Sequence, residues 1–109
     1  MTAAMPTIAD VRAARARLAP HIMPTPLIEH PALNALAKGR VLLKCETMMR
    51  VGAFKFRGAY NAASQVDRVR FPGGIVACSS GNHAQGAAAA ATLLGMHSAI
   101  VMPADAPAL

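Results

Sequence analysis

The sequence is poor in aromatic residues and in charge. It has no tryptophan, one tyrosine and three phenylalanines in 109 residues, and alanine, valine, leucine and methionine supply most of its apolar mass. Charged residues make up 15% of the chain and hydrophobic residues 54%. This balance argues against a disordered chain and favours a packed α/β or α-rich domain.

Acidic residues are scarcer still, five against eleven Lys and Arg, which gives a net charge of +6. A basic surplus raises the question of a nucleic-acid or membrane partner. The basic residues are scattered before position 71, and Asp105 is the only charged residue after it. Without a recognisable nucleic-acid motif, we expect no nucleic-acid partner. A charge bias confined to one part of a chain also indicates that a balancing part is missing.

The chain has two cysteines, Cys45 and Cys78, far apart and without the spacing of metal ligands. We expect two reduced thiols in the core of a cytoplasmic protein. The amino-terminal residues lack the apolar stretch of a signal peptide. Residues 84–102 carry no charge, but Gln85 and His97 make a membrane span a poor interpretation, so no membrane partner is expected.

Turn and cap signals divide the first half of the chain into short elements. Thr7 and Asp10 resemble a capping box and predict a helix over residues 8–18. Prolines at 24 and 26 force residues 21–27 into an extended conformation. Two further elements are expected, a helix over 32–37 that stops at Gly39 and a strand over 40–46.

The second half reads as a helix followed by a strand–helix–strand unit. The first helix is predicted from Lys55 or Arg57 to Val66, and the unit covers residues 75–103 with an alanine-rich helix that ends near Gly95. Short joints of this kind predict a parallel sheet with a right-handed crossover. A sheet of about three strands has an open edge, so we expect the chain to be a fragment.

The pentapeptide "SSGNH" at 79–83 follows a predicted strand and opens a helix. Parallel sheets bind ligands at the carboxyl ends of their strands, and a helix amino terminus offers unpaired amides. Ser79, Ser80 and Asn82 add side-chain donors, and Gly81 allows close approach to the backbone. Two interpretations stay open at this point, a site for a carboxylate or phosphate and a turn in which serine or asparagine caps the helix.

Lys55 lies between Phe54 and Phe56 in an otherwise small and apolar run. Such surroundings desolvate an amine and lower its pKa, which yields the neutral nucleophile that imine formation requires; the charge of Arg57 acts in the same direction. A lysine in the first turn of a helix also commonly extends into solvent without a function. His83 has no acidic partner at metal-ligand spacing, so no metal site is expected.

Two motifs, in this order along the chain, favour the functional interpretations of Lys55 and of residues 79–83. "VGAFKFRGAYNA" (51–62) and "ACSSGNHAQGAA" (77–88) resemble the serine/threonine dehydratase branch of the fold-type II pyridoxal-phosphate enzymes, and "TPLIEHPALN", "VLLKCE" and "AIVMPADAP" resemble it on the flanks. The branch includes threonine ammonia-lyases and serine racemase. The resemblance covers nearly the whole chain and implies an α/β fold, an incomplete three-layer αβα arrangement with a parallel sheet. Residues 1–55 would then pack on a missing larger domain, and 56–109 would begin the smaller one.

The resemblance also implies roles for individual residues. Lys55 matches the lysine that holds pyridoxal 5'-phosphate as a Schiff base and shuttles the α-proton, and Phe54 matches a residue that packs near the cofactor ring. The 79–83 segment, with Ser79, Ser80, Asn82 and His83, matches the loop that grips the substrate carboxylate. Asn82 would also bond the ring hydroxyl oxygen of the cofactor. Ser80 matches the residue that acts in serine racemase on the face opposite the lysine.

Two departures from the family pattern stand out. Ala53 replaces a serine that many members have, which removes a hydroxyl and leaves the geometry. The glycine-rich loop that cradles the cofactor phosphate is missing, because the only adjacent glycines, Gly73 and Gly74, lie in a turn before a strand. We therefore expect the isolated chain to bind the cofactor weakly and to turn over no substrate.

The resemblance implies a lyase that converts L-threonine or L-serine to a 2-oxo acid and ammonia, in a homo-oligomer when complete. Serine racemase or 3-hydroxyaspartate ammonia-lyase activity is the alternative within the family, and Ser80 keeps the racemase open. A non-catalytic remnant of such an enzyme is the alternative of another class. The residues do not distinguish which hydroxyamino acid is preferred.

Overall fold

The amino-terminal helix forms where its capping residues predict it. In the computed structural model, which describes residues 5–106, helix α1 spans Ile8–Leu18. The amide of Asp10 donates to Thr7 Oγ1 at 3.4 Å, and the amide of Thr7 donates to the Asp10 carboxylate at 2.7 Å. The reciprocal bonds satisfy two amides at the helix start, which confirms the capping box.

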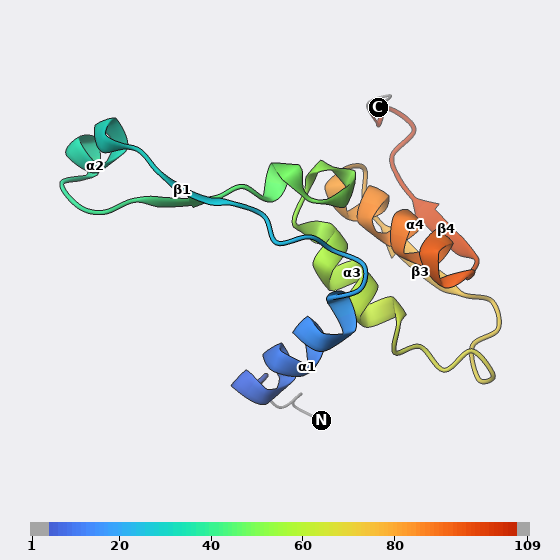
Figure 1. Ribbon diagram of the computed structural model, residues 1–109. Coiled ribbons are helices and arrows are strands. Elements are labelled where there is room, and N and C mark those ends of the chain that lie inside the picture. Colours follow the sequence, from blue (N-terminus) through green and yellow to red (C-terminus); the bar gives the residue numbers. More distant parts are fainter. Residues whose placement is uncertain (1–4, 107–109) are drawn as a thin grey trace.

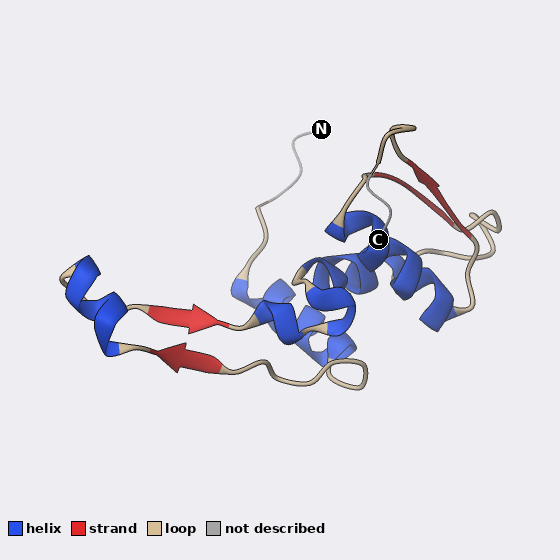
Figure 2. Ribbon diagram, turned by 90° about the horizontal axis from the view of Figure 1, so that it is seen from above, coloured by secondary structure: helices blue, strands red, loops and turns tan. Residues whose placement is uncertain are grey.

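Residues 27–44 form an arm that projects from the rest of the molecule (Figures 1 and 2). Strand β1 (Leu27–Glu29) pairs antiparallel with β2 (Leu42–Lys44), and helix α2 (Pro31–Ala37) lies at the tip. The strand predicted over 40–46 is therefore present but shorter. The expected sheet of about three strands is wrong for residues 5–106, because β2 pairs with β1 in a sheet separate from β3 and β4.

Two short 3-10 helices, η1 (Glu46–Met48) and η2 (Arg50–Gly52), connect the arm to helix α3 (Lys55–Ala63). Helix α3 begins at Lys55 as predicted but ends three residues before the expected Val66. The last residues before Val66 continue as a tight turn, because the amides of Gln65 and Val66 donate to carbonyls three residues back.

The strand–helix–strand unit is confirmed. Strand β3 (Ile75–Cys78) pairs parallel with β4 (Ser98–Val101), and helix α4 (Asn82–Leu94) connects them. Gly95, which adopts a left-handed φ of 62°, ends α4 as expected. The chain thus has an α/β fold with a small parallel sheet.

The helices cover one face of this sheet. Ile75 and Ala77 are half-buried, whereas Val76 and Cys78 alternate with them and are exposed. Within residues 5–106, one helical layer lies on the sheet, and the other face of β3 is exposed. Cys78 is exposed and Cys45 half-buried; both thiols are free, but neither lies in the core as expected.

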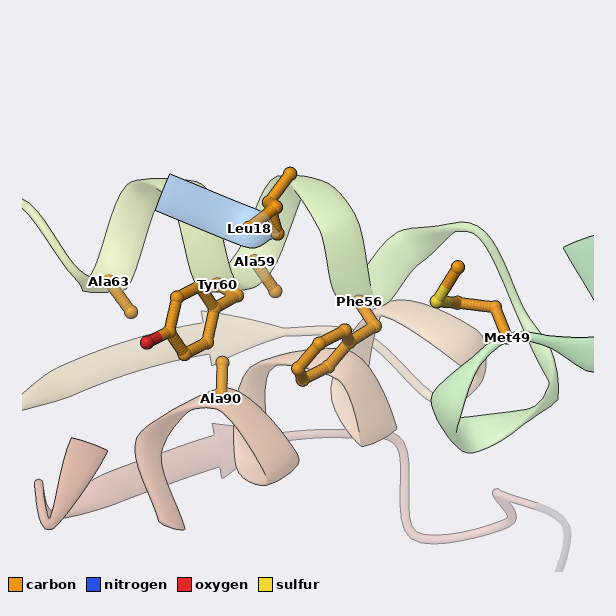
Figure 3. Packing of buried hydrophobic residues seen from close by; sticks show 7 residues of the cluster. All are labelled: Leu18, Met49, Phe56, Ala59, Tyr60, Ala63 and Ala90. Carbon is orange, nitrogen blue, oxygen red and sulfur yellow. The ribbon is translucent and has the colours of Figure 1, made fainter. Parts of the chain in front are cut away.

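The core lies where α1, η2, α3 and α4 meet, as Figure 3 shows. Phe56 is its centre and is fully buried, with the ring of Tyr60 5.8 Å away between centroids. Small residues of α3 and α4 let the two helices approach closely. The core consists of Leu18, Met49, Phe56, Ala59, Tyr60, Ala63 and Ala90. Among the helices of residues 5–106, none has the length and apolarity to cross a membrane.

Candidate active site

The two phenylalanines beside Lys55 have different surroundings. Phe56 is fully buried in the core, and Phe54 is 57% exposed. The ammonium of Lys55 lies 4.9 Å from the centroid of the Phe54 ring, a cation–π contact. Lys55 itself is exposed, so the expectation that apolar neighbours desolvate it is wrong for this chain. The amine instead lies at the surface, directed by the first turn of α3 and accessible to a ligand.

Arg57 does not act on Lys55 as an unpaired charge, which corrects a second expectation. Its Nε and Nη2 each donate to the Glu46 carboxylate at 2.8 Å. The hydroxyl of Thr25, a buried residue, donates to the same carboxylate at 2.6 Å. The bonds from Arg57 lower the pKa of Glu46 to about 2, helped by Thr25 and opposed by burial, and the pKa of Arg57 is raised in turn.

The stability of the chain should depend on pH through Glu46. A carboxyl whose folded pKa of about 2 lies below its ordinary value of 4.5 stabilises the fold above pH 4.5 and loses that contribution as pH falls toward 2. We expect Glu46→Gln to lower the free energy of unfolding at pH 7 by roughly 2 to 3 kcal/mol, a difference that closes toward pH 2. Urea unfolding across this pH range measures it.

Glu29→Gln is the matched control for this experiment. Glu29 pairs with Arg40 in the arm, but the Arg40 side chain is 73% exposed, so the pair contributes about 1 kcal/mol or less. A constant difference between Glu46→Gln and the unchanged protein from pH 7 to pH 2 would contradict the assignment of the low pKa to Glu46.

The 79–83 segment forms the turn between β3 and α4. The amide of Ser79 donates to the carbonyl of Val101, and the amide of Gly81 donates to Ser79 Oγ at 3.3 Å. Over the described residues, no side chain caps the start of α4, for which Gly81 is the N-cap. The first amides of α4, at residues 82–84, therefore have no intrahelical acceptor and are available to an anion.

The start of α3 lies directly against α4. A Cβ added at Gly86 would lie 3.1 to 3.3 Å from backbone atoms of Lys55 and Phe56, so a larger residue would press on the start of α3. The contact brings the amine-bearing turn of α3 next to the first turns of α4. Phe54, Lys55 and His83 line one cavity of about 330 Å³ together with residues of α3.

The other residues expected in the site lie around the same turn but not in this cavity. Ser80 and Gly81 line a different cavity of about 320 Å³, on the side of β4 with Ile100 and Met102. Ser79 is half-buried and Asn82 is exposed as the first residue of α4. The structure thus brings Lys55, Phe54 and His83 together and places Ser80 on the other side of the loop.

These residues fit part of pyridoxal phosphate. An exposed amine and an aromatic face suit its aldehyde and its ring, and a helix start with available amides suits an anion. Gly73 and Gly74 do not form a phosphate cradle, because the amide of Gly74 donates to the carbonyl of Phe71 and the His97 carbonyl lies against the Gly74 backbone. Within residues 5–106, no group of three or more His, Cys, Asp or Glu residues is arranged to hold a metal ion.

Two parts of this site were not predicted as functional. Gly86 stands inside an alanine-rich helix, and a glycine where alanine is favoured is a signal of close backbone approach. The carboxylate of Glu46 and the hydroxyl of Thr25 gave no such signal, because their meeting depends on how the extended segment around Thr25 folds back onto η1.

Lys55, at the start of α3, shares a cavity with His83, in the first turn of the helix that follows β3, and its exposed amine suits an aldehyde cofactor. Residues 18–109 match the family model described as "Pyridoxal-phosphate dependent enzyme", and the chain belongs to this family. The cofactor expected from the sequence is that of the family. The resemblance drawn from the two motifs is therefore confirmed.

The chain is similar to two curated proteins and to one solved structure that cover most of its length. The chain is 50% identical over 91% of its length to L-threo-3-hydroxyaspartate ammonia-lyase of a Pseudomonas species and 45% identical over 97% to a catabolic L-threonine dehydratase of Staphylococcus aureus. It spans 31% of the length of each. The crystal structure of serine racemase from Dictyostelium discoideum matches with a TM-score of 0.88 and 35% identity, over 96% of this chain and 34% of that one.

Proposed function

We propose that this chain is part of a pyridoxal-phosphate-dependent hydroxyamino-acid ammonia-lyase, a threonine/serine dehydratase. The enzyme would convert L-threonine or L-serine to the corresponding 2-oxo acid and ammonia. The observation that carries the proposal is the cavity that places the exposed amine of Lys55 beside His83 at the uncapped start of α4. A catalytic amine and a carboxylate-binding loop are the two parts that this chemistry requires of the protein.

Lys55 and Phe54 have proposed roles at the cofactor. The bound cofactor supplies an electron-withdrawing ring that stabilises negative charge at the substrate α-carbon. Lys55 would hold the cofactor through its amine and, once the substrate amine has taken that place, would accept the α-proton on Nζ. The exposed ring of Phe54 would pack near the cofactor ring. The loss of the β-hydroxyl and hydrolysis of the resulting enamine then yield the 2-oxo acid and ammonia.

The loop between β3 and α4 holds the substrate in this proposal. The available amides of α4 and the side chains of Ser79, Ser80, Asn82 and His83 bind the substrate carboxylate, and the partial positive charge of the helix start favours it. Asn82 would in addition orient the cofactor by a bond to the ring hydroxyl oxygen of the cofactor. Holding the carboxylate fixes the α-carbon so that its hydrogen points toward Lys55.

Two further activities have support from particular observations. Ser80 lies in a cavity on the side of the loop away from Lys55, where a second proton carrier for racemisation would be needed, and serine racemase of Dictyostelium discoideum is a structural neighbour. The Pseudomonas relative is named for L-threo-3-hydroxyaspartate, which makes that compound the third candidate substrate.

The complete enzyme, in this proposal, contains a larger domain on which residues 1–55 pack, with residues 56–109 opening the smaller one. The arm supports this division, because Leu27, Ile28, Leu36 and Leu43 are apolar and 44 to 82% exposed. Leu18 and Met49 remain in the core with α3, so the two parts share that core. We further propose a cytoplasmic homo-oligomer, consistent with two free thiols.

We expect the isolated 109-residue chain to bind pyridoxal phosphate weakly, because the described residues offer no phosphate cradle. Absorbance titration should show a Lys55-linked species only at cofactor concentrations of about a millimolar or more. Tight, saturable binding by the isolated chain would contradict the assignment of the phosphate site to a missing part.

Product analysis on the complete enzyme, expressed with the reading frame beyond Leu109, tests the function. Ammonia and a 2-oxo acid from L-threonine and L-serine support the dehydratase. D-serine as the main product supports the racemase, and preference for 3-hydroxyaspartate supports the third activity. A frame that holds no glycine-rich loop downstream, together with no turnover of any of these, would establish a non-catalytic remnant and overturn the proposal.

A further inference from the structure

We propose that Glu46 is a positioning residue for Lys55. With Arg57 it closes the loop of residues 47–56, which carries the lysine at its end, and thereby holds the first turn of α3 against α4. The inference rests on the proposed function, since it assigns Glu46 a part in presenting the amine of Lys55 to the cofactor.

The contact between Glu46 and Arg57 has the geometry of a clamp. Two parallel N–H bonds of 2.8 Å join the guanidinium to both carboxylate oxygens, an arrangement that fixes orientation as well as distance. The hydroxyl of Thr25 donates to the same carboxylate, and Thr25 is only 7% exposed. Three segments of the chain therefore meet at the Glu46 carboxylate, and one of them contributes Arg57, two residues after Lys55.

The loop that the clamp closes is strained. Val51 has φ 61° and ψ 18°, a left-handed conformation that is unfavourable for a β-branched residue, and Gly52 follows with φ 67°. Met49 and Ala53 are buried on either side of them. A strained loop keeps its shape only where its surroundings fix it, and the Glu46–Arg57 pair fixes both of its ends.

The opposite side of the lysine turn rests on α4. Backbone atoms of Lys55 and Phe56 lie against Gly86, close enough that a Cβ there would press on them. The amide of Arg57 donates to the carbonyl of Phe54 at 3.1 Å, which completes the turn between clamp and lysine. The backbone of Lys55 is thus held between the Glu46–Arg57 pair and α4, while its side chain stays free.

Amide hydrogen exchange on the 109-residue chain tests the loop independently of any cofactor. Glu46→Gln keeps the shape and the acceptor for Thr25 but removes the charge; Leu18→Ala, measured at the denaturant concentration that gives equal stability, is the matched control. We expect amides of residues 49–57 to exchange about tenfold faster in Glu46→Gln than in the control, with residues 87–92 equal in both. Equal exchange of residues 49–57 in the two variants would overturn the clamp.

Cofactor affinity of the complete enzyme tests the functional half. We expect Glu46→Gln and Arg57→Gln each to weaken pyridoxal phosphate binding about tenfold relative to Leu18→Ala, and the double variant to lose no more than either single one. Arg57→Lys keeps the positive charge but cannot form the two parallel bonds to Glu46, so its cofactor affinity should lie between those of Leu18→Ala and Arg57→Gln. If Glu46→Gln does not fold, the affinity of Arg57→Lys tests the positioning role in its place.

The outcomes separate the two proposals. If the enzyme without substitutions carries no cofactor on Lys55, that result would overturn both the proposed function and the role of Glu46. Cofactor on Lys55 with equal affinity in Glu46→Gln and Leu18→Ala would overturn the positioning role alone. Additive losses in the double variant would show that Glu46 and Arg57 act separately and would also overturn the clamp.

Discussion

Lys55→Ala is expected to remove the covalently bound cofactor from the complete enzyme and to lower turnover at least about a thousandfold. The side chain supplies both the amine that binds the cofactor and the base that takes the α-proton, so no second group in the cavity replaces it. None of the other residues that line the cavity, among them Phe54, Arg57 and His83, has a primary amine to bind the aldehyde. Absorbance of the purified protein and a steady-state assay measure the two losses.

Lys38→Ala is the control for this variant. Lys38 lies in the arm at the end of α2, exposed and far along the chain from the cavity. Its replacement should change neither absorbance nor turnover. A Lys55→Ala protein that keeps the covalent cofactor signal and turns over substrate would show that another amine is the anchor.

Phe56→Ala is expected to lower the free energy of unfolding by about 3 to 5 kcal/mol. Phe56 is the fully buried centre of the core and contacts the ring of Tyr60, so its removal leaves a cavity that small neighbours such as Ala59 and Ala90 do not fill. A loss of this size is a large fraction of the stability of a small domain. Chemical denaturation followed by far-UV circular dichroism measures it.

Phe71→Ala provides the comparison of the same side chain outside the core. Phe71 is 52% exposed in the turn before β3, and its replacement should cost about 1 kcal/mol or less. Equal losses for the two variants would contradict the position of the core between α3 and α4. The Phe56 result also bears on the site, because the residue that anchors the core is the direct neighbour of Lys55.

The local elements follow from the sequence because their signals are local. The capping box at Thr7 places the start of α1, and Gly95 places the end of α4. The parallel pairing of β3 and β4 follows from the short joints around α4. The arm cannot be predicted from the sequence in this way. Strand β1 is only three residues long, too short for a periodic pattern, and it pairs with β2 on the other side of α2.

In the candidate site, too, some residues can be predicted from local motifs and others depend on the fold. Lys55 and the 79–83 segment carry motifs and were located by them, and their proximity was inferred from the family resemblance. The exposure of Lys55 does not follow from the sequence, because an apolar sequence neighbour need not be a spatial one: Phe56 is fully buried in the core, whereas Lys55 is exposed. The pair of Glu46 with Arg57 spans eleven residues and depends on the turns between them, which no short motif describes.

Borohydride reduction of the complete enzyme with bound pyridoxal phosphate, followed by peptide mass mapping, tests whether Lys55 anchors the cofactor. Reduction makes the link permanent and reports which of the three lysines of this chain carries it. We expect the added mass on the peptide that contains Lys55, with Lys38 and Lys44 unmodified. Modification of Lys38 or Lys44 in its place, or of no lysine in this chain, would contradict it.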